Sequence, residues 1–425
     1  MNSFSMDDLN TLAQIFVGKL LTADFVEAFS QFDDQMKKSM NKTKLQESWQ
    51  NATAEAGTLL QLIPTHKTEM ENHKIIIIKC QFQRFDVDVQ VVFNKQGEIS
   101  GLNFTPIHYV YNPPKYIDES TFNEVDVTVG EGKWALPGTL SIPKGRGPFP
   151  GVVLVHGSGP NDRDESIGPN KTFRDIAWGL ASKGICVLRY DKRTFKHAKQ
   201  FTPDLVAAMT VKEEVIDDVI LALKKMHQTK DIDSKRIFML GHSLGATLAP
   251  RIGLQDHQLA GLIMMAGITR SLEETILDQF TYIYGLTGTM TDQQKADLET
   301  LKMKVDKLKD PELSDNISPQ DLPLGVPIAY WRDLQDNNPV DDVKKLDLPI
   351  LILQGERDYQ VLESIDFKGW KTALSNRTNA TFKLFPKLNH LFIAGEGKST
   401  PQEYTIEGHV DEEVINSILQ WIRKI

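Results

Sequence analysis

The sequence predicts an α/β protein with a doubly wound, mostly parallel sheet and an inserted helical cap, preceded by a small α+β domain. Three observations predict this fold class. From about residue 121, short apolar runs alternate with helical patterns, as in a chain that winds strand and helix in turn. At about 268–341 the alternation lapses over a stretch of about 70 residues, which is far longer than a simple connection. Before residue 112, helical spacing gives way to strict two-residue alternation.

Residues 1–112 are predicted to form the α+β domain. Apolar residues recur at three- and four-residue spacing over residues 6–20, which predicts a helix. Apolar and polar residues alternate over 85–93, which predicts a strand with one buried face. The stretch Asn112-Pro113-Pro114 predicts a stiff linker at the end of this domain.

Residues 121–425 are predicted to form the second, α/β domain. Six of its apolar runs show no alternation, as expected for parallel strands buried on both faces. These runs are residues 151–155, 185–188, 237–240, 262–265, 348–353 and 382–385. Helical patterns between them predict crossover connections. The segment at about 268–341 is charged and helical over 292–309, and we interpret it as a helical cap over the sheet edge.

Composition argues against several classes of function. The chain has 425 residues, a net charge of -9 and no basic run, which argues against a nucleic-acid partner. Cys80 and Cys186 fall in different predicted domains, which argues against a disulfide framework and a cysteine metal site. No stretch approaches the roughly 20 apolar residues of a membrane span. We expect a cytoplasmic protein; a secreted parent with a removed signal peptide is the alternative.

The motif Gly241-His242-Ser243-Leu244-Gly245 lies between a predicted strand and a predicted helix. Acyl transfer needs an exposed hydroxyl at a sharp strand-to-helix turn, which flanking glycines permit. The helix N-terminus also favours developing negative charge. We therefore predict Ser243 as the nucleophile, with a purely structural turn as the alternative. His242 is interpreted as a packing residue.

A glycine-rich loop, residues 156–160 (HGSGP), directly follows another predicted strand. The oxyanion of a tetrahedral intermediate needs fixed N–H donors. We expect these from the backbone of Ser158 and of Leu244. A phosphate loop is not predicted, because no Lys-Ser or Lys-Thr follows. Residues 162–164 (DRD) are interpreted as an ion-paired loop anchor, with a place at the mouth of the site as the alternative.

Two later loops offer the acid and the base of a triad. Asp358 follows the strand 348–353, where its carboxylate can hold an imidazole in the required tautomer, and Glu356 is its rival. His390 follows the strand 382–385 and is the predicted base, while His409, near the terminal helix, is the rival. The chain order Ser, Asp, His is the order that this kind of site uses.

These four elements fall at the predicted carboxyl ends of four strands. With the stretches HGSGPNDRDE (156–165), RYDKR (189–193) and LQGERDY (353–359), they make residues 121–425 resemble α/β hydrolases of the esterase and acyl-thioester-hydrolase type. The three stretches look like those of bacterial carboxylesterases related to the thermophilic Thermotoga esterase. Residues 1–110 resemble the nuclear-transport-factor-like domain that precedes some of these hydrolases. The resemblance implies an α/β-hydrolase fold and carboxylesterase activity on short acyl esters.

The residues and the resemblance together predict a serine hydrolase that cleaves esters of short to medium acyl chains through an acyl-enzyme intermediate. No metal or cofactor is expected. The alternatives are an acyl-thioester hydrolase, a peptidase and a non-catalytic binding protein on the same scaffold. Tyr330 and Trp331 in the cap are predicted to bind substrate, with packing as the alternative. The expected partner is a small-molecule ester, and a homo-oligomer is left open.

Overall fold

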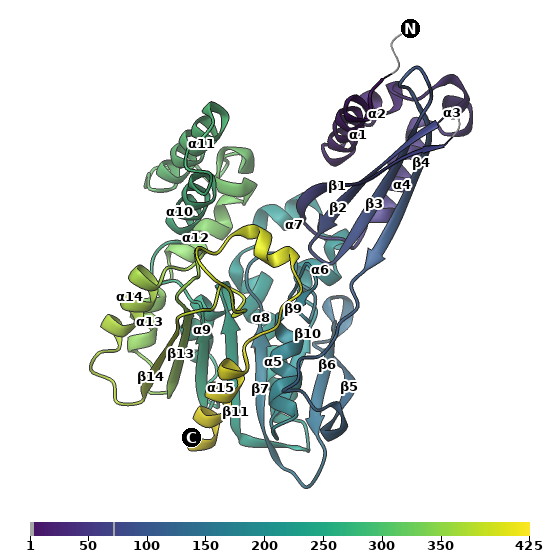
Figure 1. Cartoon of the computed structure of the whole chain (residues 1–425). Helices are drawn as coiled ribbons and strands as arrows, with labels where there is room; N and C mark the ends of the chain where they lie inside the picture. Colours follow the sequence, from purple (N-terminus) through teal and green to yellow (C-terminus); the bar gives the residue numbers. More distant parts are fainter. Residues whose placement is uncertain (1–3, 71–72) are drawn as a thin grey trace. The chain divides into compact units, whose positions relative to one another are not determined.

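The computed structural model describes residues 4–70 and 73–425, and the chain divides into two compact units (Figure 1). The first unit comprises Met1–Asn112 together with two short later segments, Ile167–Asn170 and Pro401–Glu407. The second unit comprises Pro113–Ser166, Lys171–Thr400 and Gly408–Ile425. Residues 1–3 and 71–72 of the predicted first domain lie outside the described residues.

In its described residues, the first unit consists of helices followed by an antiparallel sheet of order β1-β2-β3-β4. The elements are α1 (Met6–Leu21), α2 (Phe25–Ser30), α3 (Asp34–Ser39), α4 (Lys42–Thr53), β1 (Leu59–Met70), β2 (His73–Phe82), β3 (Phe85–Phe93) and β4 (Ile99–His108). Ser5 and Asp8 form a capping box that starts α1. The alternating residues Val87, Val89 and Val91 of β3 are buried in one core with Phe16 of α1, as their two-residue spacing predicts.

The second unit is built on an eight-stranded sheet of order β14-β13-β12-β11-β7-β10-β6-β5. Its strands are β5 (Phe122–Val129), β6 (Leu136–Pro143), β7 (Phe149–Val155), β10 (Cys186–Tyr190), β11 (Ile232–His242), β12 (Gly261–Met265), β13 (Ile350–Gly355) and β14 (Ala380–Phe385). β5 and β6 pair antiparallel at one edge, and the pairs from β10 through β14 are parallel. The predicted doubly wound, mostly parallel sheet is therefore confirmed.

Helices cover both faces of this sheet. α5 (Thr172–Ala181) and α15 (Glu412–Lys424) pack on one face, and α8 (Asp217–His227) and α9 (Leu244–Gly253) pack on the other. Successive residues of β7 are buried on opposite faces of the sheet. Val152 packs in the core beneath α5 and α15, and Val153 packs in the core beneath α8 and α9. The central strand is apolar throughout because both of its faces are buried.

The segment between β12 and β13 forms the inserted cap. Figure 1 shows α10 (Leu272–Gly285) and α11 (Asp292–Leu308) set apart from the sheet, and α12 (Ile328–Gln335) and α13 (Pro339–Lys344) lead back to it. The cap has a small core of its own, which includes the almost fully buried Trp331. None of the helices in the described part of the chain combines the length and the apolar character that a membrane crossing requires.

The remaining elements are short. They are α6 (Arg193–Lys196), α7 (Pro203–Ala208), α14 (Lys368–Ala373), β8 (Ser166–Ile167), β9 (Asn170–Lys171), the π-helical turns Lys212–Ile216 and Glu363–Phe367, and the 3₁₀ turns Glu119–Thr121, Gly132–Trp134, Ala198–Gln200, Pro319–Asp321, Pro323–Gly325 and Pro401–Thr405.

Candidate active site

Ser243 occupies the turn between β11 and α9. Its φ of 52° and ψ of -115° lie in a region that residues with a side chain rarely adopt, so the turn is strained. Its N–H donates to the carbonyl of Met265 at 2.9 Å. A side-chain carbon at Gly241 would lie 2.2 Å from the carbonyl oxygen of Gly245, and one at Gly245 would lie 2.2 Å from that of Val155. Both glycines of the motif are therefore required for this turn to form.

The glycine-rich loop after β7 lies directly beside the nucleophile. A side-chain carbon at Gly157 would lie 3.2 Å from the Cβ of Ser243. The Gly157 N–H donates to Oε1 of Glu165 at 2.7 Å, and its carbonyl accepts from Nζ of Lys192 at 2.9 Å. The next N–H, that of Ser158, has no acceptor within the described residues. That free donor is what the predicted oxyanion role of Ser158 requires.

Leu244 is the first residue of α9. The first N–H groups of a helix have no acceptor in a preceding turn, so they are available to a ligand. This placement suits the predicted oxyanion role of Leu244, which the structure does not test further.

Asp358 and His390 are brought together from different loops. Nδ1 of His390 lies 2.7 Å from Oδ2 of Asp358, and both residues are buried. Oδ1 of Asp358 accepts from the N–H groups of Gln360 at 2.8 Å and Val361 at 3.0 Å. Gln354 Nε2 donates to Oδ2 at 3.1 Å. These bonds fix the carboxylate, and because Nδ1 faces Asp358, Nε2 is the nitrogen left for Ser243.

The rival acid and base lie in different surroundings. Glu356 is exposed, although it is only two residues from Asp358. His409 pairs through Nδ1 with Oδ1 of Asp175 on α5, at 3.1 Å. The geometry thus favours Asp358 and His390. Among the described residues no hydrogen bond joins Ser243 to His390, so the complete triad stays a prediction.

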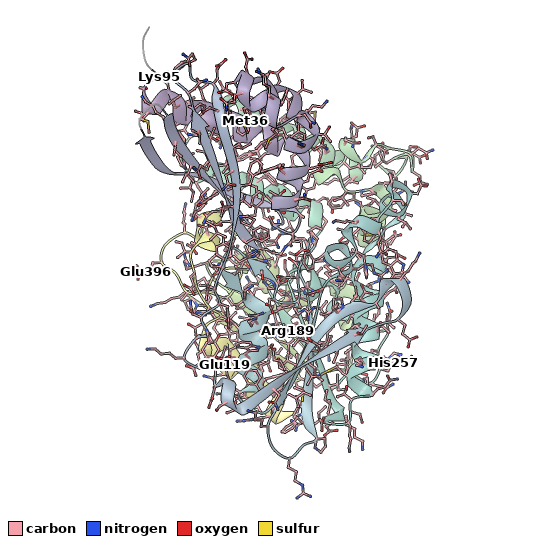
Figure 2. All side chains as sticks on the ribbon, turned by 90° about the vertical axis from the view of Figure 1, so that its right-hand side faces the viewer. Met36, Lys95, Glu119, Arg189, His257 and Glu396 are labelled. Carbon is pink, nitrogen blue, oxygen red and sulfur yellow. The ribbon has the colours of Figure 1, made fainter. Side chains whose placement is uncertain are left out.

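The charged stretch after the glycine-rich loop is an ion-paired anchor. Arg163 bonds Asp191 through Nε at 3.0 Å. Asp164 pairs with Arg174 at 2.6 Å and with Arg189, which is almost fully buried on β10 (Figure 2). These contacts agree with the anchor interpretation of residues 162–164 rather than with a place at the mouth of the site.

Tyr330 and Trp331, the predicted substrate residues, are both packed in the interior. Trp331 is 1% exposed in the cap core, and its Nε1 donates to the carbonyl of Val326 at 3.2 Å. The hydroxyl of Tyr330 donates to Oε2 of Glu214 at 2.6 Å. Neither side chain lines the cavity that lies beside Leu244. This placement favours the packing alternative, and a substrate role for either residue stays untested.

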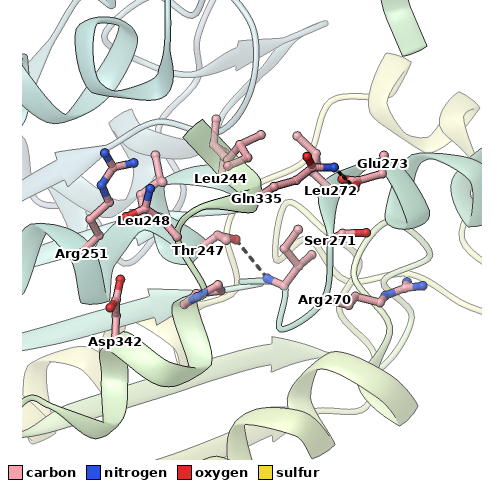
Figure 3. Close-up of a pocket in the computed structure, with 14 residues that line it drawn as sticks. Leu244, Thr247, Leu248, Arg251, Arg270, Ser271, Leu272, Glu273, Gln335 and Asp342 are labelled. Atoms are coloured by element: carbon pink, nitrogen blue, oxygen red, sulfur yellow. Dashed lines mark hydrogen bonds between the residues drawn. The ribbon is translucent and has the colours of Figure 1, made fainter. Parts of the chain in front are cut away.

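A cavity lies between α9 and the cap, beginning at Leu244 (Figure 3). It is partly open to solvent and small, with a volume of about 50 Å³. Leu244, Leu248, Ile268, Leu272 and Leu334 give it a mainly apolar lining. At its polar side, Gln335 Nε2 donates to Oε1 of Glu273 at 3.0 Å. The sequence could not reveal this cavity, because its walls come from the helix after Ser243 and from three parts of the cap.

Several polar residues that hold the loops were not predicted from the sequence. Gln354, Glu165 and Lys192 all lie inside the motifs that carry the resemblance, yet none was given a role. The available signal was a charged or amide side chain next to a predicted catalytic loop. His242, interpreted as packing, belongs to this set, because both of its ring nitrogens are hydrogen-bonded.

His156, at the start of the glycine-rich loop, is expected to make the protein sensitive to acid. Burial lowers the pKa of His156 to about 4, and the nearby Glu165 carboxylate opposes this shift only in part. A histidine in the unfolded chain has a pKa of about 6.5, so the unfolded state takes up the proton first. The free energy of unfolding should therefore fall by up to about 3 kcal/mol as the pH falls from about 6.5 to about 4.

Urea unfolding between pH 7 and pH 4 measures this dependence. His156→Gln should flatten it, whereas the same change at the exposed His257 should not (Figure 2). An equal fall in all three proteins would show that other groups cause the acid sensitivity.

Comparison with known proteins decides the family. Residues 152–404, more than half of the chain, match the alpha/beta hydrolase family. The chain belongs to this family. This hydrolase is 40% identical over 413 residues to Esterase EstD of Thermotoga maritima, which covers 97% of the chain and 95% of the relative. Residues 13–102 match a family described as a protein of unknown function (DUF3887).

Two solved structures are similar to the chain at low identity. Est1E from Butyrivibrio proteoclasticus is 16% identical with a TM-score of 0.44, over 70% of the hydrolase and 99% of Est1E. The Pyrococcus horikoshii acylaminoacyl peptidase is 12% identical with a TM-score of 0.47, over 85% of the hydrolase and 56% of the peptidase. Neither likeness bears on the substrate. The predicted α/β-hydrolase fold and hydrolase class are confirmed by the family match and by EstD.

Proposed function

We propose that the hydrolase is a serine carboxylesterase acting on esters of short to medium acyl chains. Esterase activity rests on the 40% identity with EstD over nearly the whole chain. The single observation that supports the serine mechanism is the strained turn at Ser243, which lies against Gly157 of the glycine-rich loop. The buried pair of His390 and Asp358 supplies a base with a fixed tautomer.

In the proposed acylation step, Oγ of Ser243 attacks the ester carbonyl carbon while Nε2 of His390 takes the hydroxyl proton. The carbonyl oxygen becomes an oxyanion, held by the N–H groups of Ser158 and Leu244. Asp358 keeps Nδ1 of His390 protonated and stabilises the imidazolium. The intermediate collapses with cleavage of the bond to the alkoxide, which leaves with the proton from Nε2.

Deacylation repeats these steps with water as the nucleophile. His390 Nε2 takes a proton from water, whose oxygen attacks the acyl carbon of the acyl-enzyme. The second oxyanion forms at the same two N–H groups. Its collapse releases the carboxylic acid and returns the proton to Oγ of Ser243. No step requires a cofactor.

The cavity beside Leu244 is the proposed site for the acyl chain. If the Leu244 N–H holds the carbonyl oxygen, the chain attached to that carbonyl starts next to the mainly apolar cavity walls. Apolar walls favour a hydrocarbon chain over a charged group. The cap closes the cavity at Leu334 and Gln335, which should limit chain length.

A matched substrate series tests the proposed function. We expect p-nitrophenyl acetate and butyrate to be cleaved with a kcat/KM at least about tenfold above that of the palmitate, because the cap limits the chain. The p-nitroanilides of the same acids should be cleaved far more slowly. Acyl thioesters of the same acids test the alternative of an acyl-thioester hydrolase. Anilide turnover equal to ester turnover would make the enzyme a peptidase instead.

A further inference from the structure

His242, which precedes the nucleophile, makes two hydrogen bonds in the interior. It is 2% exposed, with Nδ1 lying 2.8 Å from Oε2 of Glu165 and Nε2 lying 2.9 Å from the carbonyl oxygen of His390. A carbonyl oxygen and an ionised carboxylate only accept hydrogen bonds. With Glu165 ionised, both ring nitrogens of His242 must therefore donate, which makes the ring an imidazolium.

The electrostatic setting supports an ionised pair. Burial by itself lowers the pKa of His242, but the Glu165 carboxylate and the His390 carbonyl outweigh burial and leave that pKa raised. Burial raises the pKa of Glu165, yet the contact with His242 leaves that pKa lowered. Each group thus holds its partner in the charged form.

The same pair contacts two catalytic loops besides the Ser243 turn on which His242 lies. Glu165 uses its other oxygen to accept the N–H of Gly157, 2.7 Å away, in the loop beside Ser243. His242 is bonded to the backbone of the proposed base, His390, and the two imidazole rings are 4.8 Å apart. Glu165 itself has a φ of 48°, so its backbone is strained at the position from which its carboxylate contacts Gly157 and His242.

A role in stability alone explains these contacts less well. A buried ion pair adds little net stability, because the cost of removing two charges from water offsets their attraction. Here each polar atom of the pair that is not used between His242 and Glu165 is aimed at the backbone of a catalytic loop. With its N–H taken by Glu165, Gly157 cannot serve the oxyanion, and the free N–H of Ser158 is the next donor in the chain.

We propose that His242, held as an imidazolium by Glu165, is a positioning residue that fixes the Gly157 loop and the His390 loop relative to Ser243. The inference rests on the proposed serine mechanism and deepens it. His242 does not touch the reacting atoms; it acts through Gly157 and His390. Its loss should therefore reduce kcat more than it changes KM, because oxyanion stabilisation acts in the transition state.

The main test compares His242→Gln and Glu165→Gln with the unchanged full chain. Each variant should lower kcat for p-nitrophenyl butyrate by about 10²–10³-fold, the size of losing an oxyanion donor, with KM changed by less than about threefold. The rate of fluorophosphonate labelling at Ser243 should fall in parallel. The double variant should lose little more than either single variant, because the two side chains act as a unit.

The matched control is His197→Gln. His197 is also buried and uses both ring nitrogens, with Nε2 bonded to the Ala135 carbonyl at 3.0 Å and Nδ1 bonded to Gln200 at 3.0 Å. It is outside the proposed site, so kcat per labelled Ser243 should stay unchanged even if Tm falls. Rates are expressed per serine labelled once the fluorophosphonate reaction has gone to completion, which removes the effect of partial unfolding.

A folded His242→Gln variant whose kcat per labelled serine stays within about threefold of the unchanged enzyme would overturn the positioning role. If that variant does not fold, the positioning role is tested by the kcat of Glu165→Gln and by the ring ¹⁵N spectrum of the unchanged enzyme. The spectrum should show both nitrogens of His242 protonated, and a neutral ring would overturn the inference. A failure of the serine mechanism is distinct, because Ser243 of the unchanged enzyme would then not be labelled at all.

Discussion

Ser243→Ala is expected to lower kcat for p-nitrophenyl butyrate by roughly a millionfold, by analogy with other serine triads, while Tm changes little. The hydroxyl at the turn is the only proposed nucleophile, and alanine keeps the Cβ that the strained backbone at φ 52° already accommodates. Initial rates and the far-UV spectrum of the purified full chain measure both effects. Fluorophosphonate should label the unchanged enzyme at Ser243 and leave the variant unlabelled.

Ser375→Ala is the matched control, since Ser375 is an exposed serine of the same unit. It should retain full activity and full labelling. Substantial ester turnover by purified Ser243→Ala would mean that the nucleophile has been assigned to the wrong residue.

Asp358→Asn should cost about 10⁴-fold in kcat, since an amide in place of the carboxylate leaves the imidazole in the wrong tautomer. The carboxylate is buried and bonded to His390 Nδ1 at 2.7 Å, so water cannot replace it. Glu356→Gln is the natural control in the same loop. Because Glu356 is exposed, that change should alter kcat by less than about twofold.

The same comparison applies to the two histidines. His390→Ala should abolish turnover, whereas His409→Ala should leave kcat nearly unchanged and act on stability through the lost contact with Asp175. Steady-state rates of all four variants on one ester give the ranking. An inverted order within either pair would show that the acid loop or the base loop has been assigned to the wrong residue.

Local sequence was sufficient to predict the elements of the fold and to propose the chemical groups of the site. The strand β7 is apolar at every position from Val152 to Val155, and that pattern alone indicates burial on both faces. The glycines around Ser243 predict the sharp turn, and for Gly241 the steric reason lies within the motif, because a side-chain carbon there would meet the carbonyl of Gly245. Asp358 and His390 could be chosen because each follows an apolar run that ends at the same edge of the sheet.

Contacts between distant segments could be decided only by the tertiary structure. Glu165 and His242 are 77 residues apart, and His242 and His390 are 148 apart, so no periodicity encodes their bonds. The same holds for the cavity, whose walls meet only after the cap folds onto α9.

The boundary between the two units could be predicted from local sequence, but the later segments of the first unit could not. The composition shift near residue 112 predicts a boundary, because it reflects a local change from alternating strands to a proline-rich linker. It could not show that Ile167–Asn170 and Pro401–Glu407 belong to the first unit, where the Gly168 N–H donates to the carbonyl of Gln83 at 2.7 Å. Local patterns determine which elements form and which groups they carry. The partner of each loop depends on where the folded chain places segments that are far apart in sequence.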